Sequence, residues 1–187
     1  MALKATIFKA EIQVADLDRN HYSDHSLTLA RHPSETDERM MVRLLAFALN
    51  ADEEGLSFAR GLSVDDEPDL WAKDLTGAIR TWIDVGLPDE KIVRRACGRS
   101  DKVLIYSYGG SAAQRWWQAA GAKLERSDNL GVIDLPVEAT QAMAALAQRT
   151  MRLQYSMQDG QVLLTDGTRT AEIVPVELKP IRSFRRT

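Results

Sequence analysis

Two aspartates, Asp69 and Asp84, are the residues in this sequence whose type and spacing best suggest chemistry. Asp84 lies near the end of residues 79–85, a segment rich in the β-branched and aromatic residues that are typical of strands. Because side chains alternate across a strand, Asp84 shares a face with Arg80 and Trp82. A carboxylate in such a strand is costly to bury without a partner or a cation.

Asp69 follows Pro68 at the start of residues 69–73, which we expect to form a second short strand. If that strand pairs with residues 79–85, the carboxylates of Asp69 and Asp84 converge. Two converging carboxylates suit Mg²⁺ or Mn²⁺, which prefer oxygen ligands, and such an ion activates a water and offsets the charge of a phosphodiester. Pro-Asp is also a common turn sequence, so the spacing alone does not separate a metal site from a turn.

The segments around this pair alternate between strand and helix patterns. We expect strands at residues 5–14, 24–31, 102–108, 131–135, 151–158, 161–165 and 170–178, a short strand or extended link at residues 56–62, and helices at residues 34–50, 88–98, 111–120 and 136–149. Ser34 is the expected cap of the first helix, with Asp37 three residues later. The order predicts an α/β (α+β) domain over residues 1–187, with a mixed sheet flanked by helices. The N-terminal hairpin and the C-terminal strands are expected to form an additional small β-sheet.

Composition narrows the class of protein. The chain has 187 residues with a formal net charge of −3, which does not indicate a dedicated duplex-DNA binder. Its only cysteine is Cys97, so an intrachain disulfide is excluded. The N-terminus lacks the apolar core of a signal peptide, and no stretch approaches the roughly 20 apolar residues of a membrane span. The sequence therefore predicts a cytoplasmic protein with no membrane association.

Basic residues gather in two places. Arg94, Arg95, Arg99 and Lys102 form one cluster, and Lys179, Arg182, Arg185 and Arg186 form a basic tail. Either group is suited to contact a phosphate backbone. The alternative is that both are ordinary solvated surface.

Several strings in the sequence resemble the YaeQ family over nearly the whole chain. They are Asp66-Glu67-Pro68-Asp69-Leu70-Trp71, Trp82-Ile83-Asp84-Val85-Gly86-Leu87-Pro88-Asp89, Arg31-His32-Pro33-Ser34-Glu35-Thr36 with Arg39-Met40-Met41, and the opening Met1-Ala-Leu-Lys-Ala-Thr. The resemblance implies a small bacterial protein with a variant of the PD-(D/E)xK nuclease fold, a restriction-endonuclease-like mixed sheet. A link to transcription elongation has also been attached to the family.

The superfamily motif implies roles for individual residues. Asp69 matches the first acid and Asp84 the second, while the lysine position falls on Gly86, which has no side chain. Lys91, in the first turn of the helix that follows Pro88, is the best substitute, and Lys73 is the second choice. The resemblance thus implies an acid pair whose lysine comes from a neighbouring element.

Superfamily members often carry a glutamate on the first helix. Glu38 fits this role better than Glu35, because it shares a helical face with Met41 and Leu45, whereas Glu35 would only favour the helix dipole. The implied metal ligands for Mg²⁺ or Mn²⁺ are Asp69, Asp84 and Glu38, with Lys91 assisting the water. We therefore expect a metal-dependent nuclease. The alternative is a non-catalytic module that binds nucleic acid or a transcription-elongation partner, which Gly86 and the net acidic charge favour.

Overall fold

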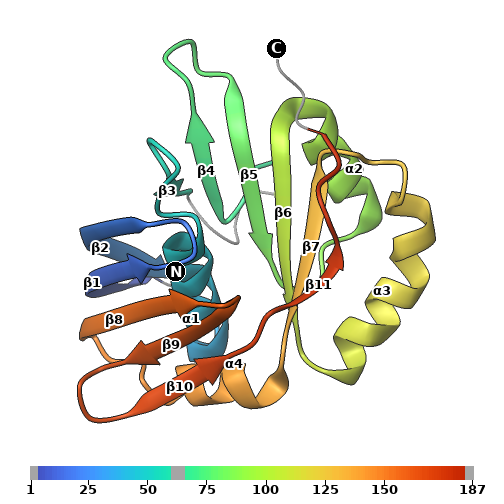
Figure 1. The fold of residues 1–187 in the computed structure, drawn as a ribbon. Coiled ribbons are helices and arrows are strands. Elements are labelled where there is room, and N and C mark those ends of the chain that lie inside the picture. The colour runs from blue at the N-terminus through green and yellow to red at the C-terminus, as the bar shows by residue number, and fades with distance from the viewer. Residues whose placement is uncertain (1–3, 60–65, 184–187) are drawn as a thin grey trace.

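The structure, a computed structural model, describes residues 4–59 and 66–183 (Figure 1). These residues form two mixed sheets and four helices, a mixed α/β (α+β) fold. The first sheet has the strand order β10-β9-β8-β1-β2, and the second has the order β11-β7-β6-β5-β4-β3. The strands are β1 Thr6–Asp16, β2 His21–Arg31, β3 Ser57–Phe58, β4 Leu70–Lys73, β5 Ile79–Val85, β6 Ser100–Tyr108, β7 Leu130–Leu135, β8 Thr150–Gln158, β9 Gln161–Thr165, β10 Thr170–Ile173 and β11 Val176–Lys179. The helices are α1 Asp37–Leu49, α2 Glu90–Arg99, α3 Ser111–Leu124 and α4 Val137–Ala144.

The first sheet joins the two ends of the chain, as expected from the sequence. The β1 and β8 strands run parallel, with Lys9 opposite Thr150, and the β1–β2 and β8–β9 pairs are antiparallel. The single strand expected at residues 170–178 is wrong. It divides into β10, which pairs with β9, and β11, which pairs with β7 in the other sheet. Pro175 lies between the two and has no N–H group to continue a ladder.

The elements form four layers. One core cluster joins the inner face of the first sheet, α1, α4 and one face of the second sheet, and the other joins the opposite face of the second sheet to α2 and α3. In Figure 1, α1 and α4 accordingly lie against the first sheet, while α2 and α3 cover the far side of the second. The central helix α1 is therefore enclosed by β-structure on both sides.

This enclosure explains the sequence of α1. Residues 40–48 are all buried, including Arg43, whereas the sequence pattern predicts a single apolar stripe. The helix begins later than expected, because Thr36 and not Ser34 is the cap: the Thr36 hydroxyl accepts the backbone N–H of Arg39 at 3.1 Å. A buried arginine requires a buried acidic partner, and Glu35 is that partner.

Other boundaries differ from the expected ones. The α4 helix ends at Ala144 rather than near residue 149, and residues 56–62 contribute only the two-residue strand β3, with residues 60–62 outside the described residues. Parallel strands β5, β6 and β7 are connected through α2 and α3, so the carboxyl ends of β5 and β6 meet at one edge of the sheet. Within the described residues, every helix is too short or too polar to cross a bilayer.

Candidate active site

The antiparallel pairing of β4 with β5 brings Asp69 and Asp84 together. Leu70 lies opposite Ile83, so the residue before Leu70 and the residue after Ile83 are neighbours. The backbone N–H of Asp69 donates to Oδ1 of Asp84 at 3.3 Å. Both side chains are buried, with Asp69 5% and Asp84 9% exposed. The two acids that the sequence singled out thus lie side by side at the carboxyl end of β5.

Asp84 is held by neutral donors only. The indole N–H of Trp82 donates to its Oδ2 atom at 2.8 Å, in addition to the Asp69 N–H. Burial and then the negative charge of Asp69 raise the pKa of Asp84 to about 7, against the opposing effects of these hydrogen bonds and of Arg39. At neutral pH the carboxyl group of Asp84 therefore exchanges between its protonated and charged forms.

Asp69 is held by a cation. Nη2 of Arg39, from the first turn of α1, donates to both carboxylate oxygens of Asp69, at 2.7 and 2.9 Å. The backbone N–H of Val85 also donates to Asp69 Oδ2 at 2.8 Å. Burial alone would lower the pKa of Arg39, but the charges of Asp69 and Glu35 outweigh it and raise that pKa. The cation beside the first acid is therefore Arg39.

Glu35 links Arg39 to the buried Arg43. Its Oε1 atom accepts from Nη1 of Arg39 at 3.0 Å and from Nε of Arg43 at 2.8 Å, and its Oε2 atom accepts from Nη2 of Arg43 at 2.7 Å. Nη2 of Arg43 also donates to the carbonyl of Ala30 at the end of β2, at 3.3 Å. Glu35 lies one residue before the helix cap, and beyond any effect on the helix dipole it anchors a chain of charges that ends at Asp69.

The other expected residues are not among those that line the cavity with the pair. The carboxylate of Glu38 accepts from the hydroxyl of Thr140 on α4 at 2.6 Å. Lys91 is exposed on α2, and the Lys73 ammonium group lies over the ring of Trp71, 3.3 Å from its centroid. Neither lysine lines the cavity in front of Asp69 and Asp84. Among residues 4–59 and 66–183, no cluster of three or more His, Cys, Asp or Glu residues is placed to hold a metal ion.

Gly86 lies in a turn that disfavours a side chain. Its φ angle is +100°, a conformation that a residue with a β-carbon adopts only with strain. The chain turns out of β5 here, and the Gly86 N–H still donates to the carbonyl of Tyr106 at 2.9 Å. A lysine at this position would have to adopt the left-handed conformation, so the turn itself favours glycine.

A cavity of about 580 Å³ opens in front of the acids. Asp69, Asp84 and Arg39 line it together with Tyr108 at the end of β6, whose pKa is raised to about 12, chiefly by burial. Apolar side chains line it as well, among them Leu87, Pro88, Ile92 and Ala112. The carboxyl ends of parallel strands are where open α/β sheets bind ligands.

The α3 helix begins at the rim of this cavity. Gly109 and Ala112 line the cavity, and the cap residue Gly110 provides no side-chain hydrogen bond. A β-carbon at Gly110 would lie 2.7 Å from Cγ2 of Val137, so only glycine fits. The first turn of this 14-residue helix is thus close to the acids, and its backbone N–H groups favour anions.

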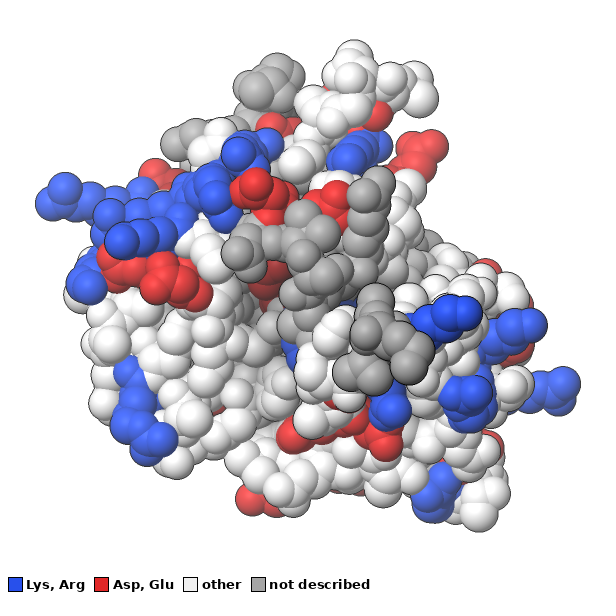
Figure 2. All heavy atoms as spheres, turned by 180° about the vertical axis from the view of Figure 1, so that it is seen from behind, with Lys and Arg blue, Asp and Glu red and all other residues white. Residues whose placement is uncertain are grey.

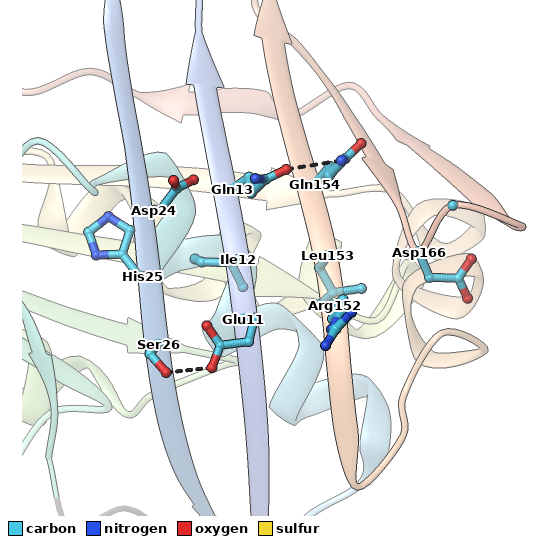
Figure 3. Close-up of a pocket in the computed structure, with 11 residues that line it drawn as sticks. Glu11, Ile12, Gln13, Asp24, His25, Ser26, Arg152, Leu153, Gln154 and Asp166 are labelled. Carbon is cyan, nitrogen blue, oxygen red and sulfur yellow. Dashed lines mark hydrogen bonds between the residues drawn. The ribbon is translucent and has the colours of Figure 1, made fainter.

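A second cavity, of about 520 Å³, lies on the outer face of the first sheet (Figure 3). Four of its polar side chains form two hydrogen-bonded pairs: Ser26 donates to Glu11 at 2.5 Å, and Gln154 donates to Gln13 at 3.0 Å. His25 points to the opposite side of the strand and packs edge-on against Phe47. This face has no buried acid pair and no cation bound to one, so the cavity at β5 and β6 is the better candidate.

The basic residues that the sequence singled out have diverse surroundings. Lys102 pairs with Glu53 and Arg182 with Glu125, whereas Lys179 is buried on β11. Arg185 and Arg186 lie outside the described residues. Arg94, Arg95 and Arg99 are exposed on α2.

Known proteins match this chain along most of its length. The family model described as YaeQ protein matches residues 1–175. The chain is 50% identical over 173 residues to "Uncharacterized protein YaeQ" of Escherichia coli (strain K12), covering 92% of this chain and 95% of that protein. The Salmonella typhi protein of the same name is 49% identical with the same coverage.

Solved structures show the same architecture. The crystal structure of YaeQ protein from Xanthomonas axonopodis pv. citri has a TM-score of 0.90 and 51% identity, and the match covers 94% of this chain and 98% of that one. The YaeQ protein from Pseudomonas syringae has a TM-score of 0.89 and 34% identity, with 96% and 98% covered.

Proposed function

We propose that this chain, which belongs to the YaeQ family, hydrolyses phosphodiester bonds of a nucleic acid with Mg²⁺ or Mn²⁺ held by Asp69 and Asp84. The observation that carries the proposal is the buried acid pair, which lines a cavity at the carboxyl ends of β5 and β6. The resemblance of the sequence to the PD-(D/E)xK superfamily supports it, because the same two residues match the two acids of that motif.

The charges around the pair favour a divalent cation. The guanidinium of Arg39 is shared between Asp69 and Glu35, so it does not balance a charge on Asp84 as well. Burial and then the charge of Asp69 raise the pKa of Asp84, and a cation bound at the pair would oppose both effects. Two carboxylates provide the oxygen ligands that Mg²⁺ and Mn²⁺ prefer. The residues present therefore fit such an ion.

The bound ion would supply an activated water and offset charge on the phosphate. Asp69 and Asp84 would provide its ligands. Arg39 would take the role of the missing lysine, since its guanidinium already lies at the first acid and is suited to bind phosphate oxygens. The first backbone N–H groups of α3 would stabilise negative charge on the phosphate from the opposite rim.

Cleavage assays test this proposal directly. The purified chain would be incubated with labelled single-stranded and duplex DNA and RNA, with Mg²⁺, with Mn²⁺ and with EDTA. We expect cleavage that needs the divalent cation and is lost in Asp84→Asn. The matched control is Asp24→Asn, an exposed acid on the outer face of the first sheet, which should cleave like the unmodified chain. Equal cleavage by Asp84→Asn would identify a contaminating nuclease.

A second candidate is a non-catalytic module that binds nucleic acid or a partner in transcription. One observation favours it: each carboxylate oxygen of Asp69 and Asp84 already accepts a hydrogen bond from a protein donor. This arrangement is what a purely structural acid pair requires. If neither Mg²⁺ nor Mn²⁺ binds at millimolar concentration, this second candidate replaces the first.

A further inference from the structure

We propose that the substrate is single-stranded and that its backbone lies along α2, on an exposed row of basic side chains. We call this row the α2 basic stripe, and it consists of Lys91, Arg94, Arg95 and Arg99. The proposal rests on the proposed function for the position of the reacting phosphate, and it adds the class of substrate and the path of the strand.

The helical spacing places these four residues together. Positions i, i+3, i+4 and i+8 share one side of a helix, and the opposite side packs on the second sheet through Val93, Ala96 and Cys97. At 1.5 Å per residue the stripe is about 12 Å long. Figure 2 shows basic side chains gathered over this part of the molecule. A chain with a net charge of −3 thus carries a local basic surface suited to a phosphate backbone.

The stripe adjoins the cavity. Pro88, which precedes α2, and Ile92, in its first turn, both line the cavity in front of Asp69 and Asp84. Lys91 is the immediate neighbour of Ile92. A nucleic-acid strand whose reacting phosphate lies at the acid pair therefore passes close to the N-terminal end of the α2 basic stripe.

The burial of the acids favours a single strand over a duplex. Asp69 and Asp84 are 5% and 9% exposed, and Leu87, Pro88 and Ile92 line the same cavity. A duplex is stiff on the scale of this cavity, so its phosphates enter the recess less readily than those of a flexible single strand. The unpaired bases of a single strand are also free to contact the apolar side chains of the cavity.

When no nucleic acid is bound, Asp66 pairs with two residues of the α2 basic stripe. Its carboxylate pairs with Arg95 at 3.0 Å and with Arg99 at 3.6 Å. All three side chains are 41–62% exposed, and ion pairs of this kind are weak, so a phosphate can replace the carboxylate. Asp66 also immediately precedes Glu67 and Pro68 of the cavity lining, so the competing acid is a near neighbour in sequence of the acid pair.

Fluorescence anisotropy in EDTA tests the path without relying on cleavage. The probes are a labelled 12-nucleotide single strand and its duplex. We expect the single strand to bind more tightly, and we expect Arg95→Ala/Arg99→Ala to weaken its binding about tenfold. The slope of log K against log[salt] should become shallower by about 1.4, because each phosphate that an arginine no longer neutralises accounts for about 0.7. Asp66→Asn should strengthen binding severalfold, and Arg152→Ala, an exposed arginine on the outer face of β8, should leave it unchanged.

Two results would overturn the proposal. One is unchanged affinity and salt dependence in Arg95→Ala/Arg99→Ala, with folding verified by circular dichroism. The other is a duplex that binds as tightly as the single strand. The hydrolysis proposal fails under a different result. If the single-stranded nucleic acid binds as expected but no cation supports cleavage, hydrolysis is wrong and the proposed binding path along α2 is retained.

Discussion

Two buried carboxylates near α1, those of Glu35 and Asp84, have opposite surroundings. Glu35 accepts hydrogen bonds from the guanidinium groups of Arg39 and Arg43. Asp84 accepts only from a neutral indole and a backbone N–H group, and the nearest acid, Asp69, opposes its ionisation. The contrast separates a carboxylate that holds the fold together from one that lacks a balancing charge, and the second is where we place the function.

The largest effect on stability is expected from removal of the Glu35 carboxylate. Glu35→Ala leaves Arg43, which is fully buried, without its acid, and removal of one partner of a buried pair costs about 3–5 kcal/mol. Urea denaturation measures the free energy of unfolding. The matched control is Asp37→Ala, which removes the more exposed pair with Arg31 and should cost less than about 1 kcal/mol. Equal losses in the two variants would show that Glu35 is no anchor.

The carboxyl group of Asp84 predicts that the free energy of unfolding depends on pH. The folded-state pKa of about 7 lies above the ordinary value of about 3.9 in the unfolded chain, so between these values the folded state holds a proton that the unfolded state has lost. In EDTA the free energy of unfolding should therefore fall as pH rises from 4 to 7, by up to about 4 kcal/mol from this group.

Asp84→Asn is the check on that pH dependence. The amide cannot ionise, so this variant should lose most of the decline and should be more stable than the unmodified chain above pH 7. Denaturation curves at pH 4.5, 6 and 8 measure the difference. The same decline in both proteins would assign it to other groups.

Arg39 connects Glu35 to Asp69, the neighbour of Asp84, and its removal should affect activity. Arg39→Ala should lower kcat by about 10²–10³-fold, the usual loss when one donor to a developing negative charge is removed. Arg39→Lys should restore only part of it, because a lysine cannot reproduce the planar guanidinium that reaches both Glu35 and Asp69. Initial rates with a labelled single strand provide the measurement, and a full rate in Arg39→Ala would exclude Arg39 as the substitute for the lysine.

The smallest effect concerns the turn at Gly86, which follows β5. Gly86→Ala meets no atom within 4 Å, so its cost is that of a β-carbon at a positive φ, about 1–2 kcal/mol. Gly98→Ala, in the helix α2 and also without a close neighbour, should instead stabilise by about 0.5–1 kcal/mol. Thermal melts of the two variants should therefore shift in opposite directions.

The sequence predicted those features that depend on local patterns. The strands around Asp69 and Asp84 and the small sheet from the two ends of the chain follow from alternation and turn residues, and the structure confirms both. The part played by Arg39 was missed, because it lies 30 residues before Asp69 and meets it only through packing of α1 on the second sheet. The sole signal was its place in one of the strings shared with the YaeQ family.

The other differences also have long-range causes. The structural role of Glu35 could not be assigned from sequence. That role depends on its ion pair with Arg43, whose burial requires sheets on both sides of α1. The division of residues 170–178 follows from Pro175 and from the open edge of β7, which belongs to the other sheet. Glu38 was chosen for its helical face and Lys91 for its place in the first turn of the helix after Pro88. The structure places Glu38 against Thr140 and Lys91 at the surface.

Calorimetric titration with Mn²⁺ tests the central claim most directly. The account predicts one site that binds at millimolar concentration or tighter in the unmodified chain, that is lost in Asp84→Asn, and that is retained in Glu38→Gln. Absence of binding by the unmodified chain, or equal binding by Asp84→Asn, would contradict the assignment of a cation to Asp69 and Asp84.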